Sequence, residues 1–303
     1  VEKEAPMTFS PDGEFPVVNI EKGRLPGHFT AGWEKSEQLP RLVSFKAGVK
    51  TNVVPGKAHA VVEGVELEVL TATAAQMEQE TGIHFEFGEE SGKMHITAVG
   101  EGAHASLPHD GKNALTGLLS YLTRLPLAEC GQTETLKKLL GLMPHGETDG
   151  KSLGVKMGDE LSGDLTLAFS MLAVNGEGLD GEFDSRCPIC ANEDNVLKVI
   201  RENMANIGVT LLNEAMITPH YVDGDSHFVR TLNAAYELYT GLEGGCESMG
   251  GGTYVHDLKN GVAFGAALPG TDNRMHGADE FAVIDELMVS AKIFAQVIVD
   301  LCS

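Results

Sequence analysis

In the first half of the chain, apolar and polar residues alternate over several short segments, which is the pattern of half-buried strands. The predicted strands are 41–47, 57–64, 83–87 and 93–99. Between the second and the third, a helix is predicted over 72–81, and Gly82 follows it at a typical helix C-terminus. Another helix is predicted over 113–125, where apolar residues recur at helical spacing. The strand-strand-helix order occurs twice and describes a compact α+β layer with its helices on one face.

The second half of the chain opens with a glycine-rich linker over 141–163 that has little periodicity. After the linker, strands are predicted over 165–174 and 181–189, followed by a helix over 195–207 and a strand over 208–217. The strand-strand-helix-strand order therefore recurs, which is a weak indication of an internal structural repeat.

The two ends of the chain have a different character. Residues 1–27 are rich in proline and glycine and are interpreted as an extended segment. Near the other end, the pattern predicts a helix over 228–239, a glycine-rich turn over 247–257, a buried strand over 260–268 and a long helix over 282–301. A strand, a loop and a helix in this order are typical of an α/β arrangement.

Composition narrows the class of protein. The chain has 303 residues, which leaves room for two domains of roughly 150 residues each, and its formal net charge is −22. That charge excludes nucleic acid and an anionic membrane surface as partners, since both need a basic face. No apolar run approaches the roughly 18 residues that a membrane-spanning helix needs. Five cysteines, an odd and sparse number, favour a reducing compartment, so a cytoplasmic protein is expected.

Two short motifs imitate functional sites. Cys187 and Cys190 have the spacing of a redox or zinc motif, but the chain has no second pair to complete a zinc ribbon. Two unrelated thiols and a redox pair are the alternatives. Glu89 and Glu90 lie between two predicted strands, and we interpret them as a solvent-exposed turn.

One histidine lies where a predicted strand gives way to a helix. In the segment 100–114 (GEGAHASLPHDGKNA), His104 stands between two alanines, at a rim from which a side chain can reach a substrate. The structural alternative is a partly buried histidine in a capped loop.

Two residues near the ends of the chain are candidate metal ligands, because zinc accepts aspartate oxygen and histidine nitrogen. Asp12 lies in SPDGEFP, where an aspartate is also a common turn former. His276 precedes the last predicted helix beside Asp279 and Glu280, an arrangement that is also typical of helix capping.

Four stretches of the chain resemble dinuclear zinc peptidases, a family that includes peptidase V, carnosinase, aminoacylase and succinyl-diaminopimelate desuccinylase. The stretches are 10–16 (SPDGEFP), 100–114, 183–188 (FDSRCP) and 250–281. They occur in the family's order and span nearly the whole chain. The resemblance is strongest to the peptidase V-type dipeptidases.

The resemblance implies an α/β fold, in which part of a zinc-peptidase catalytic domain carries an inserted two-lobed α+β lid domain. Residues 1–27 and 221–303 would belong to the catalytic domain. The lid would take residues 28–220, with lobes at about 28–140 and 164–220.

The same resemblance implies roles for individual residues. Asp12 would bind one zinc ion and His276 the other. His104 would be the catalytic lid histidine that polarises the scissile carbonyl. The residues implied for substrate binding are Arg186, Asn52, Gly251, Gly252 and Thr253, with Arg186 taking the substrate's terminal carboxylate. A surface ion pair between Arg186 and Asp184 is the structural alternative.

The chain also departs from the family's pattern. The family places an H-x-D motif, a bridging aspartate and a Glu-Glu pair before the residue that Asp12 resembles, but only eleven residues precede Asp12 and no H-x-D occurs. We therefore expect the chain to be the C-terminal two-thirds of a dipeptidase, with a missing N-terminal segment of the same protein as its partner. His256 stands where the resemblance leads us to expect an arginine, which leaves the substrate preference open.

The expected function is metal-dependent hydrolysis of dipeptides or short peptides at the amide bond next to a free carboxylate. Two zinc ions would serve in the complete enzyme, although aspartate, glutamate and histidine also suit manganese or cobalt. An N-acyl amino acid deacylase of the same family and a catalytically incomplete peptide-binding fragment are the alternatives. The recurring strand-strand-helix-strand unit favours a monomer.

Overall fold

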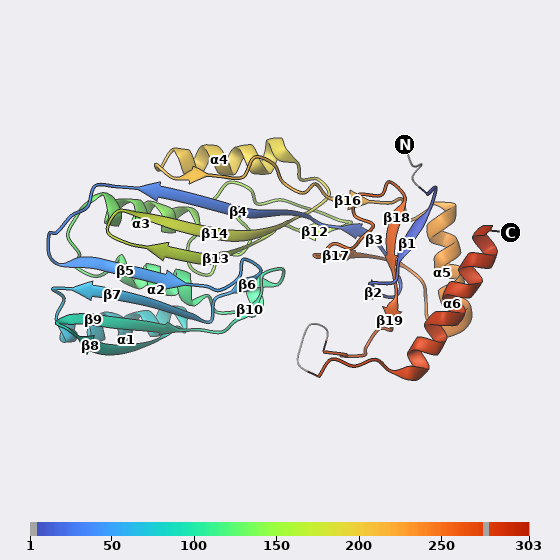
Figure 1. The fold of residues 1–303 in the computed structure, drawn as a ribbon, viewed down its shortest axis with the longest axis horizontal. Helices are drawn as coiled ribbons and strands as arrows, with labels where there is room; N and C mark the ends of the chain where they lie inside the picture. The colour runs from blue at the N-terminus through green and yellow to red at the C-terminus, as the bar shows by residue number, and fades with distance from the viewer. Residues whose placement is uncertain (1–4, 275–278, 303) are drawn as a thin grey trace. The chain divides into compact units, whose positions relative to one another are not determined.

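The computed structural model describes residues 5–274 and 279–302. The chain forms two compact units. The first unit comprises Val1–Gly23, Glu160–Ser162 and Pro219–Ser303, and the second unit comprises Arg24–Asp159 and Gly163–Thr218. Each unit combines a sheet with helices, so the prediction of an α/β fold is confirmed (Figure 1).

The second unit is built on one eight-stranded sheet (Figure 1). In hydrogen-bonded order the strands are β15 (Thr210–Leu211), β4 (Gly23–Gly32), β14 (Gly178–Cys187), β13 (Thr166–Val174), β5 (Arg41–Ala47), β7 (Lys57–Glu63), β9 (Lys93–Val99) and β8 (His84–Glu90). The segments 28–140 and 164–220 both contribute strands to this sheet and side chains to one apolar core.

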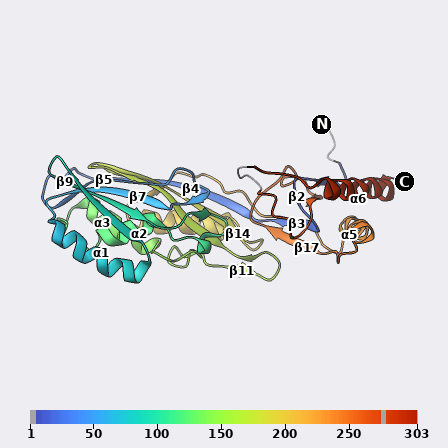
Figure 2. The same ribbon diagram turned by 90° about the horizontal axis from the view of Figure 1, so that it is seen from below.

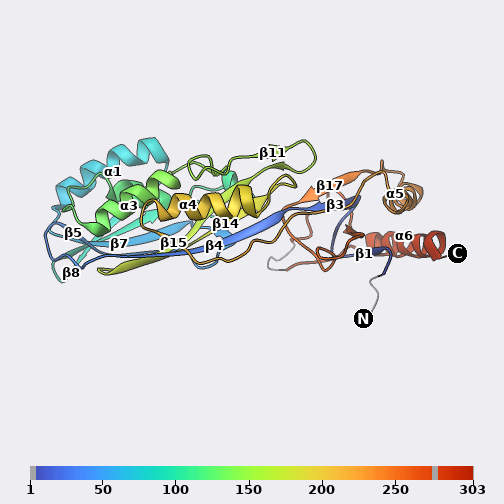
Figure 3. The same ribbon diagram turned by 90° about the horizontal axis from the view of Figure 1, so that it is seen from above.

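Helices cover one face of this sheet, as the views from below and from above show (Figures 2 and 3). They are α1 (Leu67–Thr81), α2 (Ala114–Leu122), α3 (Gly131–Leu142) and α4 (Lys198–Ala205). Asn113 fixes the start of α2, because its Oδ1 accepts hydrogen bonds from the backbone N–H groups of Leu115 (3.0 Å) and Thr116 (3.3 Å). Its Nδ2 donates to the carbonyl of Phe169 at 2.8 Å and thereby ties the helix to β13.

The strand β13 contains a bulge that sets its orientation. Phe169 pairs with Phe183 and Met171 pairs with Glu182, so Ser170 is the extra residue. The residues of β13 that face the core are therefore Leu167 and Phe169 before the bulge, but Leu172 and Val174 after it. The partner strand β14 alternates without interruption.

Several predicted elements are confirmed, and others need correction. The hairpin of β8 and β9 is confirmed, and Glu89 and Glu90 are exposed at its end. The helix predicted over 72–81 begins five residues earlier, at Leu67. The strand predicted over 208–217 is wrong for most of its length, because only Thr210–Leu211 form a strand with β4, and Ile217 adds one isolated bridge to Arg24. The helix α3 has no predicted counterpart.

The strand β4 lies within a segment that the sequence shows only as extended. Its buried positions alternate regularly as Gly23, Leu25, Gly27 and Phe29. Two of these four residues are glycines, which carry little hydropathy signal. The alternation is therefore visible in the burial of the residues but not in their apolar character.

The first unit has a smaller sheet and its own core. Its strands are β1 (Thr8–Ser10), β18 (Gly261–Phe264), β3 (Val17–Glu21) and β16 (His220–Tyr221), with β17 (Cys246–Met249) paired in parallel with β3. The helices are α5 (His227–Thr240) and α6 (Ile284–Cys302). Phe15 lies in the core, where its ring meets those of Phe264 at 4.9 Å and Tyr236 at 5.4 Å between centroids.

Two expectations from composition can be compared with the structure. Among the described residues, no helix is long and apolar enough to cross a membrane. Cys187 is buried in the core of the second unit, Cys190 is exposed, and no disulfide joins them.

A glycine in β4 is required by the close approach of an aromatic ring. A Cβ atom on Gly27 would lie 2.0 Å from Cζ of the fully buried Phe183, whereas one on Gly32 of the same strand would lie 3.7 Å from its nearest neighbour. We expect Gly27→Ala to lower the free energy of unfolding by about 1–3 kcal/mol through overpacking. Gly32→Ala is the matched control and should leave it nearly unchanged. Urea titration of both variants checks this, and equal effects would contradict it.

Candidate functional site

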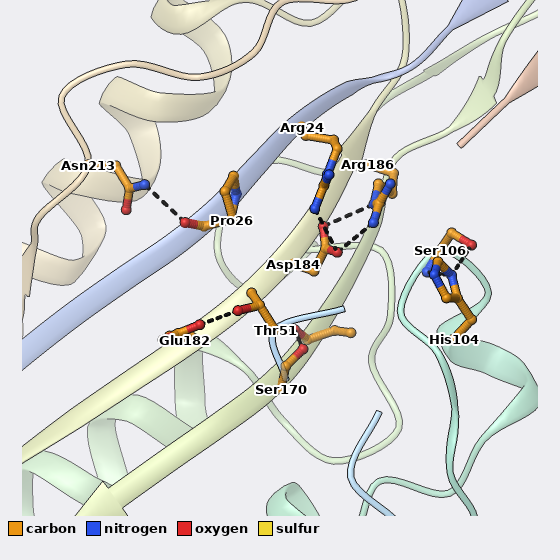
Figure 4. A network of polar contacts seen from close by, with 11 residues as sticks. Arg24, Pro26, Thr51, His104, Ser106, Ser170, Glu182, Asp184, Arg186 and Asn213 are labelled. Atoms are coloured by element: carbon orange, nitrogen blue, oxygen red, sulfur yellow. Dashed lines mark hydrogen bonds and ion pairs between the residues drawn. The ribbon is translucent and has the colours of Figure 1, made fainter. Parts of the chain in front are cut away.

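His104 lies on a short exposed strand of the second unit. The strand β10 (Ala103–His104) pairs with β6 (Val53–Val54). The Nδ1 atom of His104 accepts a hydrogen bond from the backbone N–H of Ser106 at 3.2 Å and lies 2.6 Å from its Oγ (Figure 4). Because a backbone N–H can only donate, Nδ1 is an acceptor, and the neutral ring carries its proton on Nε2. The alternative of a partly buried histidine is wrong, since the residue is exposed.

The loop that follows His104 packs against β13. Ala105 is fully buried in a small cluster with Val54 and Ala168. Its backbone N–H donates to the carbonyl of Asn52 at 3.0 Å, so Asn52 and His104 lie on adjoining backbone segments. Ala168 is paired with Asp184 across the β13–β14 ladder. The segments of Asn52 and His104 therefore pack beside the part of the eight-stranded sheet that carries the Asp184–Arg186 pair.

Asp184 and Arg186 form a buried ion pair on β14. Arg186 donates from Nε to Oδ1 of Asp184 at 3.0 Å and from Nη2 to Oδ2 at 2.7 Å (Figure 4). The side chain of Asp184 is 0% exposed and that of Arg186 is 4% exposed. The alternative of a surface ion pair is therefore wrong, because both partners are inside the protein.

A second arginine approaches the same carboxylate. The Nη2 atom of Arg24, on β4, lies 3.8 Å from Oδ2 of Asp184. Burial lowers the pKa of the Arg24 guanidinium, and the positive charge of Arg186 lowers it further, while Asp184 acts in the opposite direction. No sequence signal pointed to Arg24, because β4 itself was not predicted.

Asp12 lies at a pocket of the first unit. It precedes the two-residue strand β2 (Gly13–Glu14), which pairs in parallel with β19 (Ala266–Ala267). The pocket has a volume of about 190 Å³, and Glu14, Glu280 and Glu286 line it together with Asp12. His276 lies outside the described residues, although Asn273 and Glu280, which precede and follow it in the chain, both line this pocket.

The described residues do not by themselves fit a pair of metal ions. Among residues 5–274 and 279–302, no three histidine, cysteine, aspartate or glutamate side chains come close enough together to hold one ion. Asp12 is the one predicted metal ligand within this part of the chain. Its exposed carboxylate has the donor chemistry that zinc accepts, but a zinc site needs three or four protein ligands.

The glycine-rich loop after β17 is organised by a buried glutamate. Glu21, at the end of β3, is 0% exposed. It accepts hydrogen bonds from the backbone N–H of Thr253 at 3.0 Å and from Thr253 Oγ1 at 2.6 Å. His256 Nδ1 lies 2.8 Å from Oε2 of Glu21. Glu21 therefore positions the loop residues Gly251, Gly252 and Thr253. Sequence reasoning missed it, although a glutamate at the end of the largely apolar run VVNIE is a signal of a charged group near a core.

The predicted site residues fall into two groups. Asn52, His104 and Arg186 come together in the second unit. Asp12, Gly251, Gly252 and Thr253 belong to the first unit.

Comparison with known proteins finds relatives that are named as dipeptidases. The chain is 34% identical over 303 residues to the protein named "Putative dipeptidase YtjP" of Bacillus subtilis, and 34% identical over 298 residues to the Beta-Ala-Xaa dipeptidase of Lactobacillus delbrueckii. Each match covers 97% of this chain but only 63% and 62% of the respective relative. No family model matches the chain.

The solved structures that resemble the fold include the aminoacylhistidine dipeptidase of Vibrio alginolyticus. The TM-score is 0.50 and the sequence identity 14%, over 98% of this chain and 66% of that one. Nearly the whole chain is thus similar in sequence to proteins named as dipeptidases, and similar in fold to a solved dipeptidase.

The buried acceptor at Glu21 provides a test of how the glycine-rich loop is held. We expect Glu21→Ala to lower the free energy of unfolding by about 3 kcal/mol, because it leaves the N–H and hydroxyl of Thr253 and the ring of His256 without their acceptor. Amide hydrogen exchange over 250–256 should accelerate as well. The exposed Glu247→Ala on β17 is the control, and an equal effect from both variants would contradict the assignment.

Proposed function

We propose that this chain belongs to a metal-dependent dipeptidase, which hydrolyses the amide bond next to a free carboxylate. The observation that carries the proposal is that the segments of Asn52 and His104 pack beside the part of the sheet that carries Arg186. These are the residues that a dipeptidase of the resembled family would use on its substrate. The similarity to relatives named as dipeptidases supports it.

His104 is proposed to stabilise the oxyanion that develops on the scissile carbonyl. Its Nδ1 accepts from Ser106, which leaves Nε2–H as the donating side of the neutral ring. A donor of this kind acts on charge that grows in the transition state, so its contribution falls mainly on kcat.

Arg186 is proposed to supply positive charge for the substrate's terminal carboxylate. Asn52, on the segment beside His104, is proposed to contact the substrate through its side-chain amide. Gly251, Gly252 and Thr253, whose loop is held by Glu21, are proposed to contact the substrate through their backbone groups.

Asp12 and His276 are proposed as metal ligands. A pair of zinc ions, or of manganese or cobalt ions, would supply a hydroxide nucleophile at neutral pH if bound there. The proposed enzyme is a cytoplasmic monomer. One chain forms the whole eight-stranded sheet, and the edges of that sheet are a two-residue strand and a strand with exposed charges, which disfavours pairing with a second copy.

The test of this function is a substrate panel. The zinc-supplemented protein is assayed with a β-alanyl dipeptide, an α-dipeptide, the amide of that dipeptide and an N-acetyl amino acid. Hydrolysis of the dipeptides, lost with a chelator and restored by zinc, is the expected result. Preferred hydrolysis of the N-acetyl amino acid would favour a deacylase. Binding without turnover of any substrate would favour a peptide-binding fragment.

A single substitution tests the role of His104. We expect His104→Ala to lower kcat by roughly 100- to 1,000-fold with little change in stability, because the exposed ring is removed together with its oxyanion donor. His109→Ala is the matched control, since His109 is an exposed histidine of the same loop, with 61% of its side chain accessible. Steady-state kinetics on a dipeptide measure both variants. A drop of the same size for His109→Ala would refute the specific role.

A further inference from the structure

The Asp184 carboxylate already occupies one edge of the Arg186 guanidinium. Arg186 uses Nε and Nη2, the two nitrogens of one edge, for its two hydrogen bonds to Asp184. A guanidinium binds a carboxylate most strongly through two parallel N–H groups of such an edge. This edge of Arg186 is therefore committed within the protein.

Arg24 lacks acceptors at the same place. Its Nη2 lies 3.8 Å from Oδ2 of Asp184, which is an ion-pair distance but too long for a hydrogen bond. Its Nε is buried and has no hydrogen-bond partner among the residues that the structure describes. A buried donor without an acceptor lowers the stability of the fold. The Arg24 guanidinium is therefore able to bind an additional acceptor.

The positive charge of the two arginines also favours binding of an anion. The guanidinium groups of Arg24 and Arg186 both lie close to the carboxylate of Asp184, in a chain whose formal net charge is −22. Arg24 has 35% of its side chain exposed, in contrast to Asp184 and Arg186, so it is the member of the cluster that solvent reaches. Burial is the main cause of the lowered pKa of Arg24, and the positive charge of Arg186 lowers it further.

The backbone fixes where the Arg24 side chain begins. The N–H of Arg24 donates to the carbonyl of Ile217 at 2.9 Å, and the N–H of Ile217 donates back at 2.9 Å. Leu25 and Phe29 of the same strand point into the helix-covered core, so alternation places Arg24 on the opposite face. Asp184 and Arg186 lie on that face too, with the Ala105 loop packed beside them (Figure 4).

We propose that Arg24 is a specificity-determining residue that donates directly to the carboxylate of the substrate, while Arg186, held by Asp184, supplies the second positive charge. This inference rests on the proposed function. It assigns the recognition of a free carboxylate to a pair of arginines, and the direct contact to the one whose hydrogen-bonding capacity is not used inside the protein.

The test measures binding without turnover, with N-acetyl-L-alanine and its carboxamide as probes and ligand-observed NMR on the full protein. The unsubstituted protein should bind the acid more tightly than the amide. We expect Arg24→Gln to weaken binding of the acid by about 10- to 100-fold and to leave the amide unchanged, since a hydrogen bond to a charged group is lost. Arg24→Lys keeps the charge without the planar fork and should give an intermediate affinity.

Arg124→Gln is the matched control, because it removes the same charge from an exposed ion pair with Glu80 and should change neither affinity. An acid-over-amide preference that survives both Arg24→Gln and Arg24→Lys would overturn the inference. The dipeptide panel is scored separately. A protein that hydrolyses no dipeptide but loses the acid preference on Arg24→Gln would contradict the proposed function and support this inference.

Discussion

The ladder between β13 and β14 is the constraint on which the candidate substrate residues depend. The extra residue Ser170 shifts the register of β13, so that its apolar residues reach the core on both sides of the bulge. Phe183 faces the same core from β14. Because side chains alternate along that strand, Asp184 and Arg186 both lie on the face of the sheet away from this core. Ala168, paired with Asp184, receives the loop that carries His104.

The ion pair of this face, Asp184–Arg186, is buried. Most ion pairs of the chain are exposed and contribute little to stability. The Asp184–Arg186 pair is buried, and apolar residues of similar size would stabilise the fold as well or better. Stability alone therefore does not explain why this ion pair is buried, and a role in binding or orienting another group does. The neighbouring Arg24, with an unsatisfied donor, points to binding.

The first unit uses one buried carboxylate for a different purpose. Glu21 ends the fully buried strand β3 and collects the donors of Thr253 and His256, so the glycine-rich loop is tied to the sheet at its far end. Glycines alone would leave this loop with many accessible conformations. The hydrogen bonds to Glu21 restrict them, and thereby give the backbone of the loop a defined position. Histidine at 256 fills this role through a single ring nitrogen.

By itself, the sequence determined the α/β class, the hairpin of β8 and β9, the helices α2, α5 and α6, and the glycine-rich turn, because each depends on local periodicity or on glycine. It also singled out His104, Asn52 and Arg186, which the fold brings together. The tertiary structure alone decided that β4 is a strand, that Ser170 forms a bulge, and that Arg24 and Glu21 join the sites. In each of these cases the controlling contact is to a residue more than ten positions away, such as Phe183 for Gly27, Phe183 and Glu182 for the bulge, Asp184 for Arg24 and Thr253 for Glu21. A periodicity of two or of 3.6 residues does not encode contacts at that separation.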